Sequence, residues 1–440
     1  MMLFFLKRKA ALLGTLVVVL IFAGVGYYKY SHPAVAPVTY KTPEESNVFV
    51  RFDMEAYDII SKNYWNKMKD EDIATLFQLS IQKAQNSSTT PALITKDRAG
   101  VAKMVSDAIT AIPTDEEKKK FALNTLVIAT YNLQPVNRNG ILSSKEETSF
   151  RQNVSNINPE KDLYKDLGIE KGATNEVIEQ AYKEKVAVLE KATTSEAKEE
   201  LKQVAYAREV LTNQNSKALY DEKQIEPTVF KRLIGNTMYL SISKISPTTL
   251  QEFGIAVDSA STTPRLDSMI IDFRGNIGGS LDFLKYFLGL FVGEKQYAFD
   301  LFHQGDYQVE RTVLAKFDQL ERYKEIAILT DNMTQSTAEL TTATFKRFNL
   351  AGVVGGTTRG WGTVENTYPI ETVIGEGEKY SILLVNNITL RDDNQPIEGR
   401  GVDPDIDIKN PKWKSDLSRV FRNQSLIEAI LKTATVEPLR

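Results

Sequence analysis

The 440-residue sequence contains no cysteine and only two histidines, His32 and His303. Without cysteine the chain has no disulfide, no thiolate ligand for a metal and no cysteine nucleophile. Two histidines are too few for the multi-histidine sites of many zinc enzymes. We therefore expect no metal site and no cofactor.

The sequence also lacks an excess of charge of one sign. Its formal net charge is -3, with 42% hydrophobic and 25% charged residues. These values are typical of globular proteins and give no basic surface for nucleic acid, so DNA and RNA are not expected as partners. A chain of this length exceeds the usual size of one hydrophobic core, which predicts several domains.

An uncharged apolar run, residues 10–28, follows the basic residues Lys7, Arg8 and Lys9. Its length is sufficient for a helix that crosses a bilayer. Positive charge before the helix predicts that residues 1–9 are cytoplasmic and that the bulk of the chain lies outside the cytoplasm. We expect a single-pass membrane protein whose helix is followed by a tether at 29–46.

A cleaved signal peptide is the alternative interpretation of the same run. Ala34-Val35-Ala36 has the small-x-small form of a cleavage site. The apolar run is long for a signal peptide, and Pro37 would directly follow the cut. We favour an uncleaved anchor.

The next region, residues 47–135, has apolar residues at helical spacing, for example Phe52, Ala56 and Ile59. We expect helices without visible chemistry. Residues 136–160 are rich in serine and asparagine and poor in large apolar residues, which favours a linker.

Two helical patterns joined by a polar stretch fill residues 161–224. The amino-acid sequence resembles that of a J domain at Leu167-Gly168-Ile169, Ala181-Tyr182 and Tyr220-Asp221. J domains stimulate a partner chaperone through a His-Pro-Asp tripeptide between their long helices, and this sequence has none there. The resemblance therefore implies a J-like scaffold or docking surface for a protein partner; a plain helical hairpin is the alternative.

Short β-branched runs alternate with helical patterns over residues 228–410, which predicts an α/β domain. Residues 411–440 are expected to form a helical tail. Two loops of this domain stand out.

The first loop, Asp272 to Gly279, follows a predicted strand and is rich in glycine. Glycines allow close backbone approach and leave N–H donors available for an anion or a developing oxyanion. The spacing fits neither a dinucleotide-binding fingerprint nor a P-loop. A bare strand-to-helix turn explains the loop equally well.

The second loop places Ser336 just before a predicted helix. Ser336 and Glu339 have the spacing of an N-terminal capping box, in which both side chains satisfy free helix N–H groups. On spacing alone, capping is the better explanation of this serine.

The order of four segments is more specific than either loop. These segments are Ile270 to Gly279, Ser336 to Glu339, Gly352 to Glu365, and Gly399 to Ile406. Together they resemble the C-terminal processing, or tail-specific, serine peptidases, which use a serine–lysine dyad. The resemblance implies their α/β peptidase fold, polypeptide substrates and a serine endopeptidase activity.

Carried over by position, the resemblance makes Ser336 the nucleophile, with Gly278 and the Thr337 N–H as the oxyanion donors. The family's lysine position holds Trp361 in Gly360-Trp361-Gly362, and Glu365 stands where glutamine is usual. An indole N–H only donates, so Trp361 cannot take the serine proton.

Three other side chains are candidates for the missing base. Glu365 could act as a base if burial raised its pKa. Arg359 stays protonated and cannot accept a proton. His303 lies in a segment that the family motif does not mark, and a surface or packing role explains it better.

Three functions remain open from the sequence. The chain is an active membrane-anchored serine endopeptidase with a replaced base, or an inactive pseudopeptidase that binds extended polypeptides. In the third, the peptidase-like domain is a passive scaffold and the helical and J-like regions recruit partners at the membrane.

Overall fold

The computed structural model describes residues 41–192 and 194–439, so the predicted membrane helix at 10–28 lies outside the described residues. Within those two ranges, no helix has the length and apolar character needed to cross a bilayer. Contacts divide the chain into two units, each assembled from separate segments. The first unit contains the described residues up to Ser149, Phe299–Glu310 and Trp361–Gly399; the second contains Phe150–Ala298, Arg311–Gly360 and the described residues from Arg400 onward.

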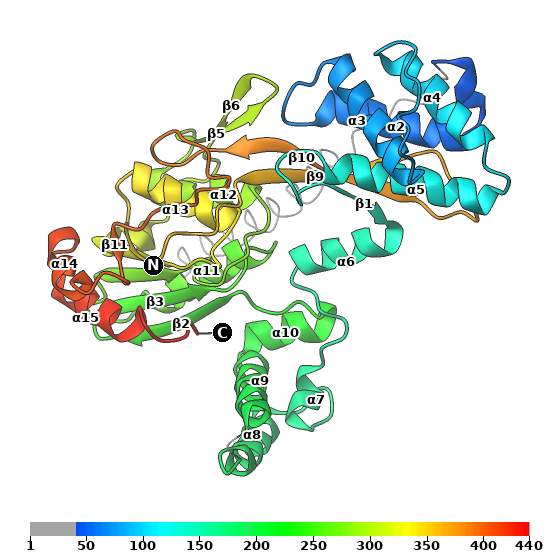
Figure 1. Cartoon of the computed structure of the whole chain (residues 1–440). Helices are drawn as coiled ribbons and strands as arrows, with labels where there is room; N and C mark the ends of the chain where they lie inside the picture. The colour runs from blue at the N-terminus through cyan, green and yellow to red at the C-terminus, as the bar shows by residue number, and fades with distance from the viewer. Residues whose placement is uncertain (1–40, 193, 440) are drawn as a thin grey trace, which may run out of the picture. The chain divides into compact units, whose positions relative to one another are not determined.

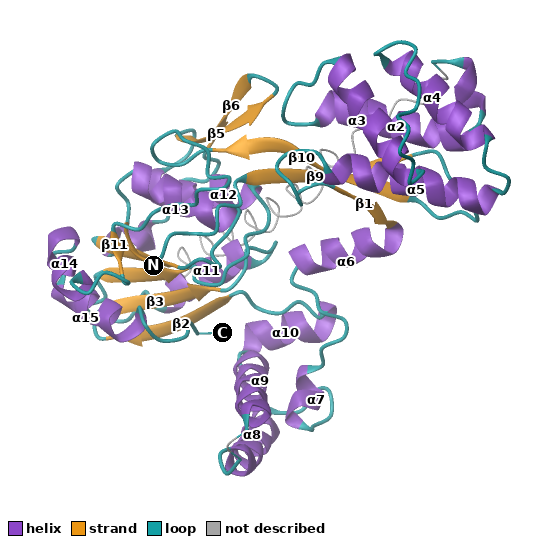
Figure 2. Ribbon diagram, viewed as in Figure 1, coloured by secondary structure: helices purple, strands orange, loops and turns teal. Residues whose placement is uncertain are grey.

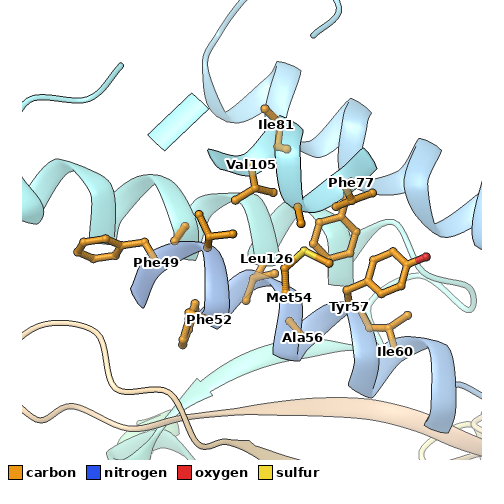
Figure 3. Close-up of a cluster of buried hydrophobic side chains, with 14 of the residues drawn as sticks. Phe49, Phe52, Met54, Ala56, Tyr57, Ile60, Phe77, Ile81, Val105 and Leu126 are labelled. Atoms are coloured by element: carbon orange, nitrogen blue, oxygen red, sulfur yellow. The ribbon is translucent and has the colours of Figure 1, made fainter. Parts of the chain in front are cut away.

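The expected helical region forms most of the first unit. Its helices are η1 (Pro43–Ser46), α2 (Val48–Asn63), α3 (Asp70–Ala84), α4 (Arg98–Thr110) and α5 (Asp115–Tyr131). Asn47 caps α2 by accepting the Phe49 N–H at 2.9 Å, and Thr114 caps α5 by accepting the Glu117 N–H. The apolar faces meet in one cluster, in which Phe52, Phe77 and Leu126 are fully buried (Figure 3).

A small antiparallel sheet completes this unit. Its strands are β1 (Gly140–Ser143), β5 (Tyr297–His303), β6 (Asp306–Arg311), β9 (Thr363–Ile370) and β10 (Tyr380–Thr389). Ile370, Tyr380 and Ile382 belong to the same apolar cluster as the helices. The helical region therefore shares its core with strands that come from more than 200 residues later in the chain.

The linker expected at 136–160 is corrected by this arrangement. Residues 140–143 form β1, which pairs with β10 from Gly140 opposite Leu383 to Ser143 opposite Tyr380, and α6 (Ser144–Val154) follows. Buried residues are absent from α6. The polar composition of α6 agrees with this exposure, but an exposed polar segment can still form a helix. The end of the expected tether is also ordered, because Glu45 in η1 is fully buried against Arg98.

The second unit begins with four helices that contain the J-like region: α7 (Leu163–Leu167), α8 (Asn175–Leu189), α9 (Ser195–Thr212) and α10 (Gln214–Lys223). Tyr164, Leu167, Ile178 and Val204 form part of their common core. Asp162 caps α7, and Gly168 ends it in the left-handed conformation at φ 72°.

A six-stranded sheet forms the centre of the second unit, in the order β11-β8-β7-β4-β3-β2. The strands are β2 (Val229–Ile234), β3 (Thr237–Ile242), β4 (Ser268–Asp272), β7 (Glu325–Thr330), β8 (Gly352–Gly355) and β11 (Ile406–Asp407). Only β2 is antiparallel to its neighbour. The expected α/β architecture is confirmed.

Helices cover both faces of this sheet (Figures 1 and 2). The helices are α11 (Thr249–Ser259), α12 (Asp282–Val292), η2 (Asp318–Arg322), α13 (Thr337–Arg347), α14 (Trp413–Val420) and α15 (Gln424–Thr433). Tyr239, Ile270 and Leu329 pack against α14 and α15. On the other side, Phe287 of α12 contacts Phe253 of α11 and Phe345 of α13 at ring distances of 4.8 and 5.5 Å.

The observed units differ from the sequence segments in two ways. The region expected as one peptidase-like domain at 228–410 contributes to both units, because β9 and β10 complete the sheet of the first. The tail at 411–440 supplies α14 and α15, whose Leu417 and Ile430 are fully buried in the core of the second unit. The order of segments along the sequence could not reveal either of these differences, because both depend on packing between residues that are far apart in the chain.

Candidate active site

The two loops singled out in the sequence lie at the same edge of the six-stranded sheet. Strand β4 ends at Asp272 and the neighbouring strand β7 ends at Thr330, and the two strands are parallel. Parallel strands bring their carboxyl ends together, which is where sites form in open α/β sheets. The glycine loop, Gly275 to Gly279, and the serine turn, Asp331 to Ser336, therefore meet.

Ser336 occupies a strained backbone conformation at the end of the serine turn. Its φ is 56° and its ψ is -128°, and α13 begins at the next residue. A non-glycine residue with positive φ is costly unless the surroundings hold it. A sharp turn of this kind between a strand and a helix exposes the side chain at the helix N-terminus, as the nucleophile elbow of α/β-hydrolases does.

Gly278 approaches this serine so closely that no other residue would fit. A Cβ placed on Gly278 would lie 2.6 Å from the Ser336 Cβ and 3.0 Å from the Thr337 nitrogen. Gly278 also has a φ of 84°, which favours glycine. Ser336, Gly278 and Thr337 thus lie next to one another in the structure.

Two hydrogen bonds join the glycine loop to the serine turn on either side of Ser336. The Gln335 N–H donates to the Asn276 carbonyl at 2.9 Å, and the Thr337 hydroxyl donates to the Gly279 carbonyl at 2.8 Å. Asp331 adds a third link by accepting the Gly275 N–H at 3.0 Å. Because both sides are held, the strained serine conformation is maintained.

The N–H groups of the two predicted oxyanion donors, Thr337 and Gly278, differ in their hydrogen bonding. The Thr337 N–H belongs to the first turn of α13, where amides have no partner within the helix. The Gly278 N–H already donates to the Asn276 side-chain oxygen at 2.8 Å. Gly278 can therefore serve an oxyanion only after Asn276 has released this N–H.

Glu339 is fully buried and connects three segments around the serine. Its Oε2 accepts the Ser336 N–H at 2.8 Å, and its Oε1 accepts the Gly360 N–H at 2.6 Å and the Thr358 hydroxyl. The Glu339 N–H is bonded to the Ser336 carbonyl at 2.8 Å. The capping box expected from the spacing of Ser336 and Glu339 is thus present, with the Glu339 carboxylate bonded to the Ser336 N–H.

The last family segment is tied to the same network. Thr358 donates its N–H to the Val402 carbonyl at 3.1 Å and accepts the Val402 N–H on its hydroxyl at 2.7 Å. A Cβ on Gly401 would lie 2.3 Å from the Thr358 carbonyl oxygen. The parts of the four sequence segments that belong to the second unit are therefore joined by hydrogen bonds.

The residues at the base position belong to the first unit, which begins again at Trp361. The Trp361 indole N–H donates to Glu365 Oε1 at 3.0 Å, and the Arg138 guanidinium lies over the indole ring at 3.5 Å from its centroid. Arg138 pairs with Glu398 at 3.0 Å, and Glu398 accepts the Gly362 N–H at 2.8 Å. The tryptophan is thus held from two sides.

Glu365 is partly buried next to this tryptophan. Burial raises the pKa of the Glu365 carboxyl, although hydrogen bonds from Thr363 and Trp361 and the charge of Arg138 act in the opposite direction. A carboxyl with a raised pKa holds its proton to higher pH than an exposed glutamate.

His303 is also in the first unit, on β5. Its Nδ1 is 2.6 Å from the Asn386 carbonyl oxygen. This hydrogen bond to the backbone is consistent with a packing role. Among residues 41–192 and 194–439 there is no group of three or more His, Asp or Glu side chains arranged for a metal ion.

Comparison with known proteins identifies two domains in the chain. Residues 236–408 match the model of peptidase family S41, and residues 162–221 match the model of the DnaJ domain. These two matches confirm the resemblances found in the sequence: the first stretch is similar to the S41 peptidases and the second to the DnaJ domains.

One similar curated protein is the carboxy-terminal processing protease CtpB of Bacillus subtilis (strain 168). It is 23% identical over 408 residues, which cover 90% of this chain and 75% of that protein. A protein named "Probable CtpA-like serine protease" from Staphylococcus aureus (strain N315) is 29% identical over 183 residues, 41% of this chain and 35% of that protein. The match to the staphylococcal protein thus spans about a third of its length.

Two solved structures are similar at low sequence identity. The photosystem II D1 C-terminal processing protease is 11% identical, with a TM-score of 0.49 over 82% of this chain and 93% of that chain. A lipoprotein from Streptococcus agalactiae is 12% identical, with a TM-score of 0.44 over 88% of this chain and 99% of that chain.

Sequence reasoning missed three residues of the site. The side-chain oxygen of Asn276 accepts the Gly278 N–H. The sequence Asn276-Ile277-Gly278 has the spacing at which an asparagine side chain bonds the backbone N–H two residues later. That signal was present in the sequence. Arg138 and Glu398 gave no signal, because they reach Trp361 and Gly362 only through folding.

We predict that Glu339→Gln lowers the stability of the second unit. The glutamine NH₂ group is a donor, and it would face one or more of the three donors that the Glu339 carboxylate now accepts. Loss of buried, charge-assisted hydrogen bonds typically costs about 2–4 kcal/mol. Urea unfolding followed by circular dichroism measures the effect. Glu294→Gln, at an exposed glutamate of the same unit, is the matched control. Equal stability of the two variants would contradict the role assigned to Glu339.

Proposed function

We propose that this chain binds extended polypeptides, such as the C-terminal tails of other proteins, at the Ser336 site of its S41 domain. Three observations support the proposal: the S41 match at 236–408, the similarity to proteins named carboxy-terminal processing proteases, and the turn that presents Ser336 beside Gly278. Peptide carbonyls are the groups that a serine and flanking N–H donors accommodate.

We further propose that the bound polypeptide is not cleaved at an appreciable rate. The observation that carries this is Trp361, which stands at the family's lysine position and is held by Glu365 and Arg138. A serine hydroxyl needs a neighbouring base to become a useful nucleophile near neutral pH. An indole cannot supply one, and its N–H is already engaged.

Replacing the tryptophan by lysine tests whether only the base is missing. We expect Trp361→Lys to hydrolyse an unstructured fluorogenic peptide at least about 10²-fold faster than Trp361→Arg, because a positioned base contributes roughly 10²–10⁴-fold and arginine stays protonated. Ser336→Ala combined with Trp361→Lys should abolish the gained activity.

Binding and turnover by the unaltered chain complete this test. Fluorescence anisotropy of the same peptide should show binding to the wild type without cleavage. Efficient wild-type cleavage that Ser336→Ala removes would overturn the non-hydrolytic proposal. Absence of peptide binding would overturn the polypeptide-binding proposal itself.

An active peptidase with Glu365 as the base is the alternative, and the raised pKa of Glu365 favours it. A base must be deprotonated, so hydrolysis by this route should be low at acid pH and rise as the pH passes the raised pKa. Glu365→Gln should lower kcat by about 10²–10⁴-fold, and the remaining activity should no longer rise with pH. Glu371→Gln, at an exposed glutamate, should leave kcat and its pH dependence unchanged. Wild-type hydrolysis that survives Glu365→Gln would rule out this route.

We also propose that residues 10–28 anchor the chain in a membrane, with the two units outside the cytoplasm. The support is the uncharged apolar run behind Lys7, Arg8 and Lys9. Alkaline carbonate should leave the full chain in the membrane pellet of expressing bacterial cells, and an external protease should digest its units in spheroplasts. Soluble protein that begins at Pro37 would instead identify a cleaved signal peptide.

The DnaJ domain is proposed as a scaffold or docking surface for a protein partner. It has no His-Pro-Asp tripeptide between α8 and α9, so chaperone stimulation is not part of the proposal. If the S41 domain is only a passive scaffold, the unaltered chain should bind no peptide at Ser336. Deletion of residues 162–222 should then remove the protein partners.

A further inference from the structure

Arg274 links the glycine loop to the C-terminal end of the chain within the second unit. It precedes Gly275 directly, and its side chain is 8% exposed. Its Nη1 donates to the Ala434 carbonyl at 3.0 Å and to the Val436 carbonyl at 2.8 Å. The residues Ala434 to Leu439, here named the C-terminal strap, thus touch the segment that forms the predicted oxyanion site.

The opposite edge of the Arg274 guanidinium is held by a buried acidic group. Its Nε donates to Asp272 at 3.0 Å, and the Tyr239 hydroxyl donates to the same carboxylate at 2.6 Å. Asp272 is fully buried at the end of β4. A buried guanidinium that loses one set of partners is left with unsatisfied donors, so the strap and the glycine loop are energetically connected.

The strap also contacts the DnaJ domain. Glu437 pairs with Lys202 of α9 at 2.8 Å, and both side chains are exposed. Leu439 packs against the core cluster that contains Tyr239. The strap therefore contacts the DnaJ domain through Glu437, and its backbone carbonyls contact Arg274 next to the glycine loop.

The DnaJ domain is itself packed on the peptidase domain of this unit. Tyr206 of α9 contacts Phe230 of β2 at a ring distance of 6.0 Å, and Lys161 lies 4.1 Å over the Tyr206 ring and pairs with Glu226 at 3.0 Å. Burial raises the pKa of Tyr206, as expected for a ring enclosed at such a contact. The domain is docked on the peptidase core and is not held by the strap alone.

We propose that the C-terminal strap couples the DnaJ domain to the Ser336 site, by setting the position of the glycine loop through Arg274. A change at the DnaJ domain that releases Glu437 loosens the strap, frees Arg274 and lets Gly275 to Gly279 shift away from Ser336. The affinity for polypeptide then falls. This regulatory role rests on the proposed polypeptide binding, but the mechanical link does not.

Hydrogen exchange on the full chain tests the link without any peptide. Truncation after Ala434 removes the Val436 carbonyl, Glu437 and Leu439, and should speed exchange of the glycine-loop amides about tenfold. Lys202→Glu and Glu437→Lys should each speed it about two- to five-fold, as expected for an exposed ion pair. The double exchange Lys202→Glu with Glu437→Lys should restore the wild-type rate. Lys432→Ala, at an exposed residue of α15, is the control.

The peptide affinity of the same variants tests the regulatory role. Anisotropy should show an affinity loss that follows the order of the exchange rates and is reversed in the charge-exchanged double variant. Unchanged loop exchange in the truncated, still folded chain would overturn the strap. A truncation effect without any effect of the two charge reversals would overturn the coupling to the DnaJ domain. If the wild type binds no peptide, the proposed function fails while the exchange result still stands.

Discussion

The candidate site depends on one buried carboxylate, that of Glu339. Three donors from separate segments converge on it: the Ser336 N–H, the Gly360 N–H and the Thr358 hydroxyl. A buried charge is tolerated only when such donors satisfy it, and their convergence fixes the segments that carry them. The strained Ser336 backbone, the loop before Trp361 and, through Thr358, the segment at Val402 all follow from this arrangement.

The base position shows a different kind of constraint. Where a lysine amine would have to be kept neutral by burial, Trp361 is stabilised by a cation over its face and a carboxyl at its N–H. Arg138 and Glu398 continue these contacts to the Gly362 backbone. The surroundings of Trp361 are thus suited to an aromatic ring, which is the main physical reason to favour binding over turnover.

The position of the DnaJ domain is consistent with a role other than chaperone stimulation. Its α9 helix, through Tyr206, is packed on the peptidase domain, and Lys202 reaches the end of the chain. A helix used in this way has part of its surface committed within the molecule. Any partner of this domain must therefore act on the faces that remain exposed, such as Val177 and Val188 of α8.

The sequence by itself determined the α/β alternation, the helical region and both family resemblances, and through the resemblance it named Ser336, Gly278 and Thr337 as candidates. These are local features: periodicity, a glycine cluster after a strand, a serine before a helix and the order of short motifs. It misjudged 136–160, because a polar segment can still pair as β1 at a sheet edge and continue as an exposed helix.

Only the tertiary structure decided which distant residues meet. It placed β9 and β10 against the N-terminal helices, Arg138 against Trp361, and the end of the chain against Arg274. It also showed that Asn276 occupies the Gly278 N–H. Pairings of this kind are created by packing and burial across long sequence separations, and periodicity and spacing carry no information about them.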